Sequence, residues 1–127
     1  MAGPLVYVVD DDAGVRGTLA RLLASGGYEV RQYESGEDLL DTVEPLSGAC
    51  ILLDITMPAP DGFAVHKTLS ERSIDIPVIM MTGSGDLTVL ALKAGVADFL
   101  QKPFGRGELL SVIAHLAVAG ARNGSQP

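Results

Sequence analysis

The chain has 127 residues with 9 basic and 16 acidic side chains, so its formal net charge is −7, and its length suits one domain with a sizeable core. The acidic balance argues against direct binding of this segment to the phosphate backbone of nucleic acid. Because no apolar run approaches the ~20 residues of a membrane-spanning helix and the N-terminus has no basic segment of a signal peptide, we expect a cytoplasmic protein.

Short β-branched runs alternate with amphipathic stretches along the whole chain. The runs predict strands at Leu5–Val9, Glu29–Tyr33, Ile51–Leu53, Val78–Met81 and Phe99–Gln101. The stretches that follow each strand carry apolar residues at helical spacing: Val15–Leu23, Leu39–Val43, Phe63–Leu69, Leu87–Ala94 and Leu109–Leu116. Strand followed by helix, five times, predicts an α/β fold: a doubly wound, five-stranded parallel sheet of the flavodoxin-like (βα)5 type, with strand order 2-1-3-4-5.

Turn and cap residues mark the ends of these elements. Asp12 and Ser35 fit the N-caps of the first two helices, and Gly26-Gly27 ends the first helix. Residues 120–127 have no apolar period, so we expect one domain over residues 1–119 followed by a linker-like tail over 120–127. The only cysteine, Cys50, stands in an apolar run and is expected to be a small buried hydrophobic residue.

Four of the five predicted strands are followed directly by residues that can take part in chemistry. These are Asp10, Asp11 and Asp12 after the first strand, Asp54 after the third, Thr82 after the fourth and Lys102 after the fifth. In open parallel sheets, ligands bind beyond the carboxyl ends of the strands, where the strand order reverses. The first and third strands are neighbours in the predicted order, ~4.8 Å apart, so their carboxylates should share one crevice.

Carboxylates at this distance repel, and one of them would keep its proton unless a cation intervened. Oxygen ligands alone favour Mg²⁺, which binds through one or two carboxylates together with a phosphate. Lys102 adds a positive charge and Thr82 a hydroxyl, so the set could hold a phosphoryl group while a carboxylate attacks phosphorus. Taken singly, each residue fits a turn, a helix cap or a solvated side chain; their conjunction at four strand ends favours phosphoryl chemistry.

These residues also carry a resemblance to a known family. The matching runs are Val8-Val9-Asp10-Asp11-Asp12, Leu53-Asp54-Ile55-Thr56-Met57-Pro58 with Asp61-Gly62, Met81-Thr82-Gly83, and Asp98-Phe99-Leu100-Gln101-Lys102-Pro103-Phe104. In this order, they make residues 5–119 resemble a response-regulator receiver domain of two-component signalling, a member of the CheY-like superfamily. The stretch from Thr82 to Asp86, together with Asp98-Phe99, is similar to receivers of the nitrogen-fixation type that precede helix-turn-helix output domains.

The resemblance implies an acceptor and a metal shell. Asp54 would accept the phosphoryl group and also contact the metal. Asp11 would bind Mg²⁺ directly, Asp10 would bind it chiefly through water, and the backbone carbonyl of Thr56 would complete the shell, with Mn²⁺ as the alternative ion.

The resemblance also implies how the protein would change its structure after phosphorylation. Thr82 would hydrogen-bond one phosphoryl oxygen and Lys102 would pair with another, aimed by a cis bond to Pro103. Phe99 would turn inward as Thr82 moves, which remodels the face made by the fourth helix, the fifth strand and the fifth helix. From its residue type alone, Phe99 fits an ordinary core aromatic equally well.

The implied function is a phospho-acceptor switch that assists its own phosphorylation and dephosphorylation and is not an enzyme acting on a separate substrate. The phosphohistidine would come from a sensor histidine kinase or a phosphotransfer protein, because His66 and His115 fit solvated positions on helices. The remodelled face would control a partner, an output domain or a phosphorylation-dependent homodimer, with no membrane involved.

Three other classes of protein share parts of this pattern. A phosphatase with an aspartate nucleophile, of the haloacid-dehalogenase-like kind, would want an acid at position 56, which is Thr56 here. An interaction module that works without phosphorylation would have lost an acidic residue or Lys102, and both are present. A flavodoxin-like nucleotide carrier would have a glycine-rich loop after the first strand, where this chain has acids.

Overall fold

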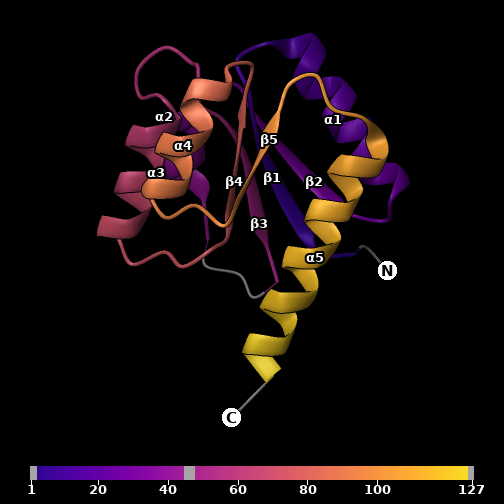
Figure 1. Cartoon of the computed structure of the whole chain (residues 1–127). Helices are drawn as coiled ribbons and strands as arrows, with labels where there is room; N and C mark the ends of the chain where they lie inside the picture. The colour runs from indigo at the N-terminus through magenta and orange to yellow at the C-terminus, as the bar shows by residue number, and fades with distance from the viewer. Residues whose placement is uncertain (1–2, 45–47, 126–127) are drawn as a thin grey trace.

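The computed structural model describes residues 3–44 and 48–125. Its strands are β1 Leu5–Val9, β2 Glu29–Tyr33, β3 Cys50–Asp54, β4 Val78–Thr82 and β5 Asp98–Gln101. Its helices are α1 Ala13–Ser25, α2 Gly36–Thr42, α3 Gly62–Glu71, α4 Gly85–Lys93 and α5 Arg106–Ser125. The strands pair in parallel in the order β2-β1-β3-β4-β5, so the predicted α/β fold is confirmed (Figure 1).

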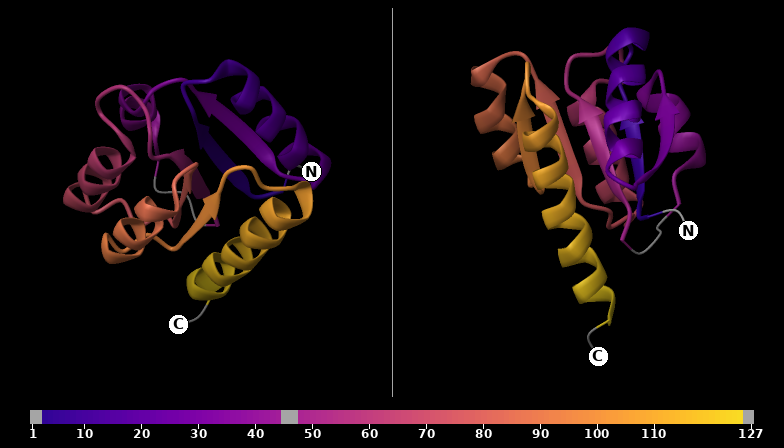
Figure 2. Two further views of the ribbon diagram at one scale, coloured as in Figure 1. Left: turned by 45° about the horizontal axis from the view of Figure 1, so that its top comes forward. Right: turned by 90° about the vertical axis from the view of Figure 1, so that its right-hand side faces the viewer.

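Helices cover both faces of the sheet. Helices α2, α3 and α4 lie on one face, and α1 and α5 lie on the other (Figures 1 and 2). Successive side chains of β3 therefore alternate between two cores, with Ile51 and Leu53 in the first and Leu52 in the second. Every residue of β1, β3 and β4 is buried, as expected for central strands covered on both sides, and Cys50 is buried as predicted.

Side-chain caps begin the first three helices. The Asp12 carboxylate accepts the Val15 N–H at 3.1 Å, and the Ser35 hydroxyl accepts the Asp38 N–H at 3.1 Å, so both predicted caps are confirmed. Asp61 caps α3 in the same way, a role that was not predicted. Each such cap stabilises its helix by about 1 kcal/mol, because it satisfies an amide that the helix itself cannot.

β3 and β4 end one residue later than predicted, and β3 and β5 also begin one residue earlier. Asp54 and Thr82 are the last residues of β3 and β4 and do not lie in the turns that follow. The ladder continues past both, since the Ile55 N–H donates to the Met81 carbonyl at 3.0 Å and the Lys102 N–H donates to the Thr82 carbonyl at 2.7 Å. A polar side chain does not prevent its backbone from pairing, so the sheet itself holds these residues in place.

Helix α5 runs into the segment for which the sequence predicts a linker-like tail. It continues to Ser125, so residues 120–125 are helical. Gly120 and Gly124 each cost a helix about 1 kcal/mol relative to alanine, but no proline interrupts the backbone hydrogen bonds before the last residue. The end of α5 projects past the edge at which the strands begin (Figure 2). Within the described ranges, none of the helices combines the length and the apolar character needed to cross a bilayer.

The turn from β3 into α3 folds back tightly on the end of β3. Gly62, the first residue of α3, donates its N–H to the Ile55 carbonyl at 3.0 Å. A Cβ at position 62 would lie 2.7 Å from the Ile55 Cα and 2.8 Å from the Asp54 carbonyl oxygen. Both are backbone atoms, so only glycine fits here without moving the strand end that carries Asp54.

Gly62→Ala should therefore lower the free energy of unfolding by about 1–3 kcal/mol, the usual cost of overpacking a tight site. Urea unfolding followed by circular dichroism measures this change. Gly107→Ala is the matched control, because a Cβ there meets nothing within 4 Å and alanine is the better helix former. Equal stability of the two variants would contradict the role of the Gly62 contact.

Candidate functional site

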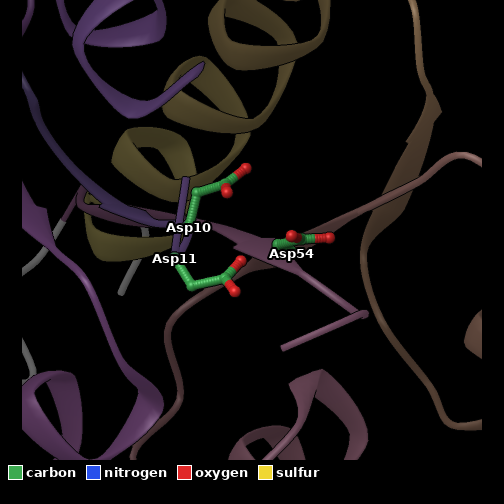
Figure 3. A group of neighbouring side chains, drawn as sticks. All are labelled: Asp10, Asp11 and Asp54. Atoms are coloured by element: carbon green, nitrogen blue, oxygen red, sulfur yellow. The ribbon is translucent and has the colours of Figure 1, made fainter. Parts of the chain in front are cut away.

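Three carboxylates meet where β1 and β3 end. The register pairs Val9 with Leu53, so the next residues on these strands, Asp10 and Asp54, are neighbours. Asp11 follows in the turn into α1, and one carboxylate oxygen from each aspartate lies within 4.8 Å of the other two. Figure 3 shows the three side chains together at this edge of the sheet. The convergence of carboxylates expected from the strand order is therefore confirmed.

The three aspartates differ in burial and in hydrogen bonding. Asp10 and Asp54 are buried, whereas Asp11 is exposed. Both oxygens of Asp10 are engaged: one accepts the Asp12 N–H at 2.9 Å and the other accepts from the Lys102 ammonium at 2.9 Å. One oxygen of Asp54 accepts the Thr56 N–H at 3.2 Å. Asp10 is thus held rigidly, while Asp11 faces solvent beside it.

Lys102, the residue that follows β5, bridges two of these carboxylates. Its Nζ lies 2.9 Å from Asp10 Oδ2 and 3.6 Å from Asp54 Oδ2. The Lys102–Pro103 peptide bond is cis, as the family resemblance implies, and a second cis bond joins Ala59 to Pro60. From the sequence, Lys102 was expected to pair only with a phosphoryl oxygen, so its ion pair with Asp10 is a finding of the structure.

The charges at the site do not balance. Burial raises the pKa of Asp54, Asp10 and Asp11 raise it further, and the Lys102 charge and the Thr56 N–H offset this only in part. Burial lowers the pKa of Lys102, but its hydrogen bond to Asp10 and the charges of Asp54 and Asp10 outweigh this, so the pKa is raised. Excess negative charge on oxygen ligands alone, with Asp11 open to solvent, fits Mg²⁺.

Thr82 stands at the neighbouring strand end, but its hydroxyl bonds within its own turn. The Thr82 Oγ1 accepts the Ser84 N–H at 3.0 Å and donates to the Ser84 carbonyl at 3.2 Å. Ser84 is the residue before α4, so the buried Thr82 hydroxyl is tied to the beginning of that helix. Ser84 was not predicted to take part; a threonine at a strand end, three residues before the first residue of a helix, is the sequence signal for such a turn.

The remaining residues singled out from the sequence lie outside the carboxylate cluster. Phe99 pairs with Met80 on the face covered by α4 and is half-buried, so it is not a fully buried core aromatic. His115 is exposed, as predicted. His66 is half-buried, and burial lowers its pKa, so the prediction of a solvated side chain is wrong for this residue.

Arg16 also contacts the site and was not foreseen. Its Nη1 donates to the Asp10 carbonyl at 2.7 Å. Side chains of a helix lean toward its N-terminus, so an arginine in the first turn after a strand can reach back to that strand's end. This geometric rule is the signal in the sequence that could have identified it.

Known proteins share this sequence pattern. The family model of the response regulator receiver domain matches residues 6–114. The transcriptional regulatory protein FixJ of Azorhizobium caulinodans is 42% identical over 123 residues, which are 95% of this chain and 58% of that protein. Nodulation protein W of Bradyrhizobium diazoefficiens is 39% identical over 111 residues, which are 86% of this chain and 49% of that protein. The chain thus spans about half the length of these relatives.

Solved structures share the fold. The FixJ-N crystal structure matches with a TM-score of 0.82 and 31% identity over 93% of this chain and 96% of that one. Full-length FixJ from B. japonicum matches with a TM-score of 0.87 and 35% identity over 98% of this chain and 62% of that one. The likeness to FixJ agrees with the nitrogen-fixation type expected from the sequence. With the carboxylates at the predicted strand ends and the family match over residues 6–114, the chain belongs to the response regulator receiver domains of two-component signalling.

Proposed function

We propose that this chain is a phosphorylation-controlled switch in which Asp54 accepts a phosphoryl group from the phosphohistidine of a sensor histidine kinase or a phosphotransfer protein. The observation that carries the proposal is the group of three carboxylates with oxygens within 4.8 Å, two of which, Asp10 and Asp54, are bridged by the Lys102 ammonium. Phosphoryl transfer depends mainly on positioning and on neutralising charge, and this arrangement offers both.

Asp54 is the carboxylate best suited to attack phosphorus. Both Asp10 oxygens already accept hydrogen bonds, from the Asp12 N–H and from Lys102, so Asp10 serves to hold the other groups. A carboxylate with a raised pKa, such as Asp54, is a better nucleophile once ionised. As the new bond from an Asp54 oxygen to phosphorus forms, the bond between phosphorus and the donor imidazole breaks, and its electron pair returns to the imidazole nitrogen.

The carboxylates would also hold the metal. Asp11 and Asp54 would contact Mg²⁺ together with the Thr56 carbonyl, while Asp10, whose oxygens are engaged, would reach it through water. When bound, Mg²⁺ would supply positive charge that offsets the carboxylates and the phosphoryl oxygens. The exposure of Asp11 beside two buried aspartates supports its role as the direct ligand.

The Thr82 turn offers a route from the phosphoryl group to the surface. To donate a hydrogen bond to a phosphoryl oxygen, the Thr82 hydroxyl must give up the bond that it donates to the carbonyl of Ser84, the residue before α4. Phe99 lies half-buried on the same face and could occupy the space that Thr82 leaves. Phosphorylation would thereby bias a two-state arrangement of α4, β5 and α5.

A surface beside the site suits a protein donor. An apolar groove of about 290 Å³ begins at Lys102 and is lined by Val15, Leu22 and Phe104 among others. A partner that brings a phosphohistidine to Asp54 must rest on the rim of the site. The groove would let it bury apolar side chains there, which a small phosphate ester cannot do.

The face proposed for dimerisation is made by α4, β5 and α5, and the charges on α4 are complementary to those of a second copy of the same helix. Val89 and Leu90 are 54% and 50% exposed on α4. Asp86 and Lys93 lie on the same stripe of the helix, three or four positions to either side, and are also exposed. Two copies of α4 packed antiparallel would bury the apolar centre and bring each Asp86 near the partner's Lys93. We infer a phosphorylation-dependent homodimer through this stripe.

The first test is phosphorylation by a small donor. Acetyl phosphate with Mg²⁺ should add one phosphoryl group to the wild type, detected by intact mass, because the acetate leaves as the Asp54 oxygen bonds phosphorus. Asp54→Asn should stay unlabelled, and chelation of Mg²⁺ should abolish labelling of the wild type. Equal labelling of wild type and Asp54→Asn would refute the assignment of the acceptor.

Lys102→Ala should fold, but phosphorylation should change its NMR shifts less than those of the wild type.

The raised pKa of Asp54 predicts a pH-dependent cost in stability. Folding disfavours the ionised form of this side chain, so stability falls as the pH rises from the ordinary carboxyl range through the folded-state pKa. In metal-free buffer, Asp54→Asn should therefore be more stable than the wild type at neutral pH, and the difference should shrink in acid. Urea unfolding against pH measures it, with Asp75→Asn at an exposed position as the control. A constant difference at all pH values would contradict this account.

Dimerisation can be separated from phosphorylation. After acetyl phosphate and Mg²⁺, the wild type should sediment as a dimer, whereas Leu90→Asp should remain a monomer although intact mass shows it phosphorylated. Asp86→Lys alone should weaken the dimer because like charges then meet, and adding Lys93→Asp should restore it. If Leu90→Asp dimerises like the wild type, the α4 stripe is not the interface.

A further inference from the structure

A ring of hydrogen bonds closes the turn between β1 and α1. The Asp10 N–H donates to the Tyr33 carbonyl at 3.2 Å, and the Asp12 N–H donates to the Asp10 carboxylate at 2.9 Å. The Arg16 backbone N–H donates to the Asp12 carbonyl at 2.9 Å as the first helical bond. The Arg16 guanidinium then donates to the Asp10 carbonyl at 2.7 Å. This last bond ties the helix back to the end of the strand that it follows.

The Asp10 carbonyl depends on this bond because the sheet ends before it. β1 stops at Val9, and Asp10 is fully buried. A buried carbonyl that loses its partner costs ~1–3 kcal/mol, and a bond from a charged donor is stronger than one from a neutral donor. The peptide that holds this carbonyl joins Asp10 to Asp11. Its plane therefore sets the directions from which both carboxylates leave the backbone.

The acidic surroundings of Arg16 favour the position of its guanidinium beside Asp10. Arg16 is half-buried and lines a groove of about 520 Å³ that is also lined by Glu34, Asp38 and Asp41. Arg21, on the same helix, differs: it is exposed, and among the described residues its guanidinium donates only to the Thr18 hydroxyl one turn away, at 3.3 Å. The two arginines therefore have the same charge but different contacts, since only Arg16 reaches the site.

We propose that Arg16 is a positioning residue for metal binding: by holding the Asp10 carbonyl, it orients the carboxylates of Asp10 and Asp11. The inference rests on the proposed metal site, and Arg16 itself touches neither the metal nor the reacting atoms. The charge of Arg16 and the position at which it holds the carboxylates have opposite effects on the affinity for Mg²⁺. Loss of a positive charge beside three carboxylates strengthens the binding of a cation, whereas loss of their alignment weakens it.

Titration with Mg²⁺ alone, followed by NMR amide shifts, separates the two effects. Arg16→Gln should weaken Mg²⁺ binding about tenfold, the lower end of what loss of an outer-shell contact costs. Arg21→Gln removes the same charge away from Asp10 and should leave the affinity unchanged or slightly tighter. Arg16→Lys should recover much of the affinity, because an ammonium can donate to the same carbonyl. Binding by Arg16→Gln that is as tight as by Arg21→Gln overturns the proposal.

Hydrogen exchange provides a readout that needs no metal. In the metal-free protein, Arg16→Gln should speed the exchange of the Asp12 and Val15 amides, which bond to the Asp10 and Asp12 carboxylates, and should leave the Met80 amide of β4 protected. Unchanged protection of both amides overturns the positioning role. If the wild type fails to bind Mg²⁺, the proposed metal site is wrong, and the exchange result alone decides the role of Arg16.

Discussion

The mutual repulsion of the carboxylates at the adjacent ends of β1 and β3 is the constraint around which the rest of this edge is built. The parallel register makes Asp10 and Asp54 neighbours, and burial under the helices strengthens their repulsion. Lys102 and two backbone amides offset part of it, yet the pKa of Asp54 stays raised. A cluster that lowers stability in this way is typical of a functional site, where incoming positive charge supplies the missing balance.

Residues around this cluster also begin or end structural elements. Asp12, whose amide holds Asp10, caps α1, and the turn that holds Thr82 leads into α4. In the proposed function, a change of charge at the strand ends would therefore act on the first turns of helices that reach the surface. On α4 this surface carries exposed Val89 and Leu90, so the same physical links could serve both phosphorylation and its readout.

Much of the fold and of the carboxylate cluster could be predicted because both follow from short-range pattern. β1 and β2 have the predicted bounds, and the caps at Asp12 and Ser35 were visible as residue types before apolar runs. The end of α5 was not predictable in this way, because its glycines suggest a linker while the continuing backbone hydrogen bonds form a helix. The burial of His66 also depends on neighbours that its own helix does not specify.

By itself, the sequence determined the order of strands and helices, the convergence of Asp10, Asp11 and Asp54, and the likeness to receiver domains. The spacing of apolar residues along the chain predicts the elements, and the carboxyl ends of parallel strands lie at one edge of the sheet, so both can be inferred without the tertiary structure. Only the tertiary structure decided which groups bond to which. Lys102 pairs with Asp10, Arg16 holds the Asp10 carbonyl, and the Thr82 hydroxyl bonds to Ser84. These contacts depend on distances between strand ends and on the lean of side chains, which sequence spacing alone does not encode.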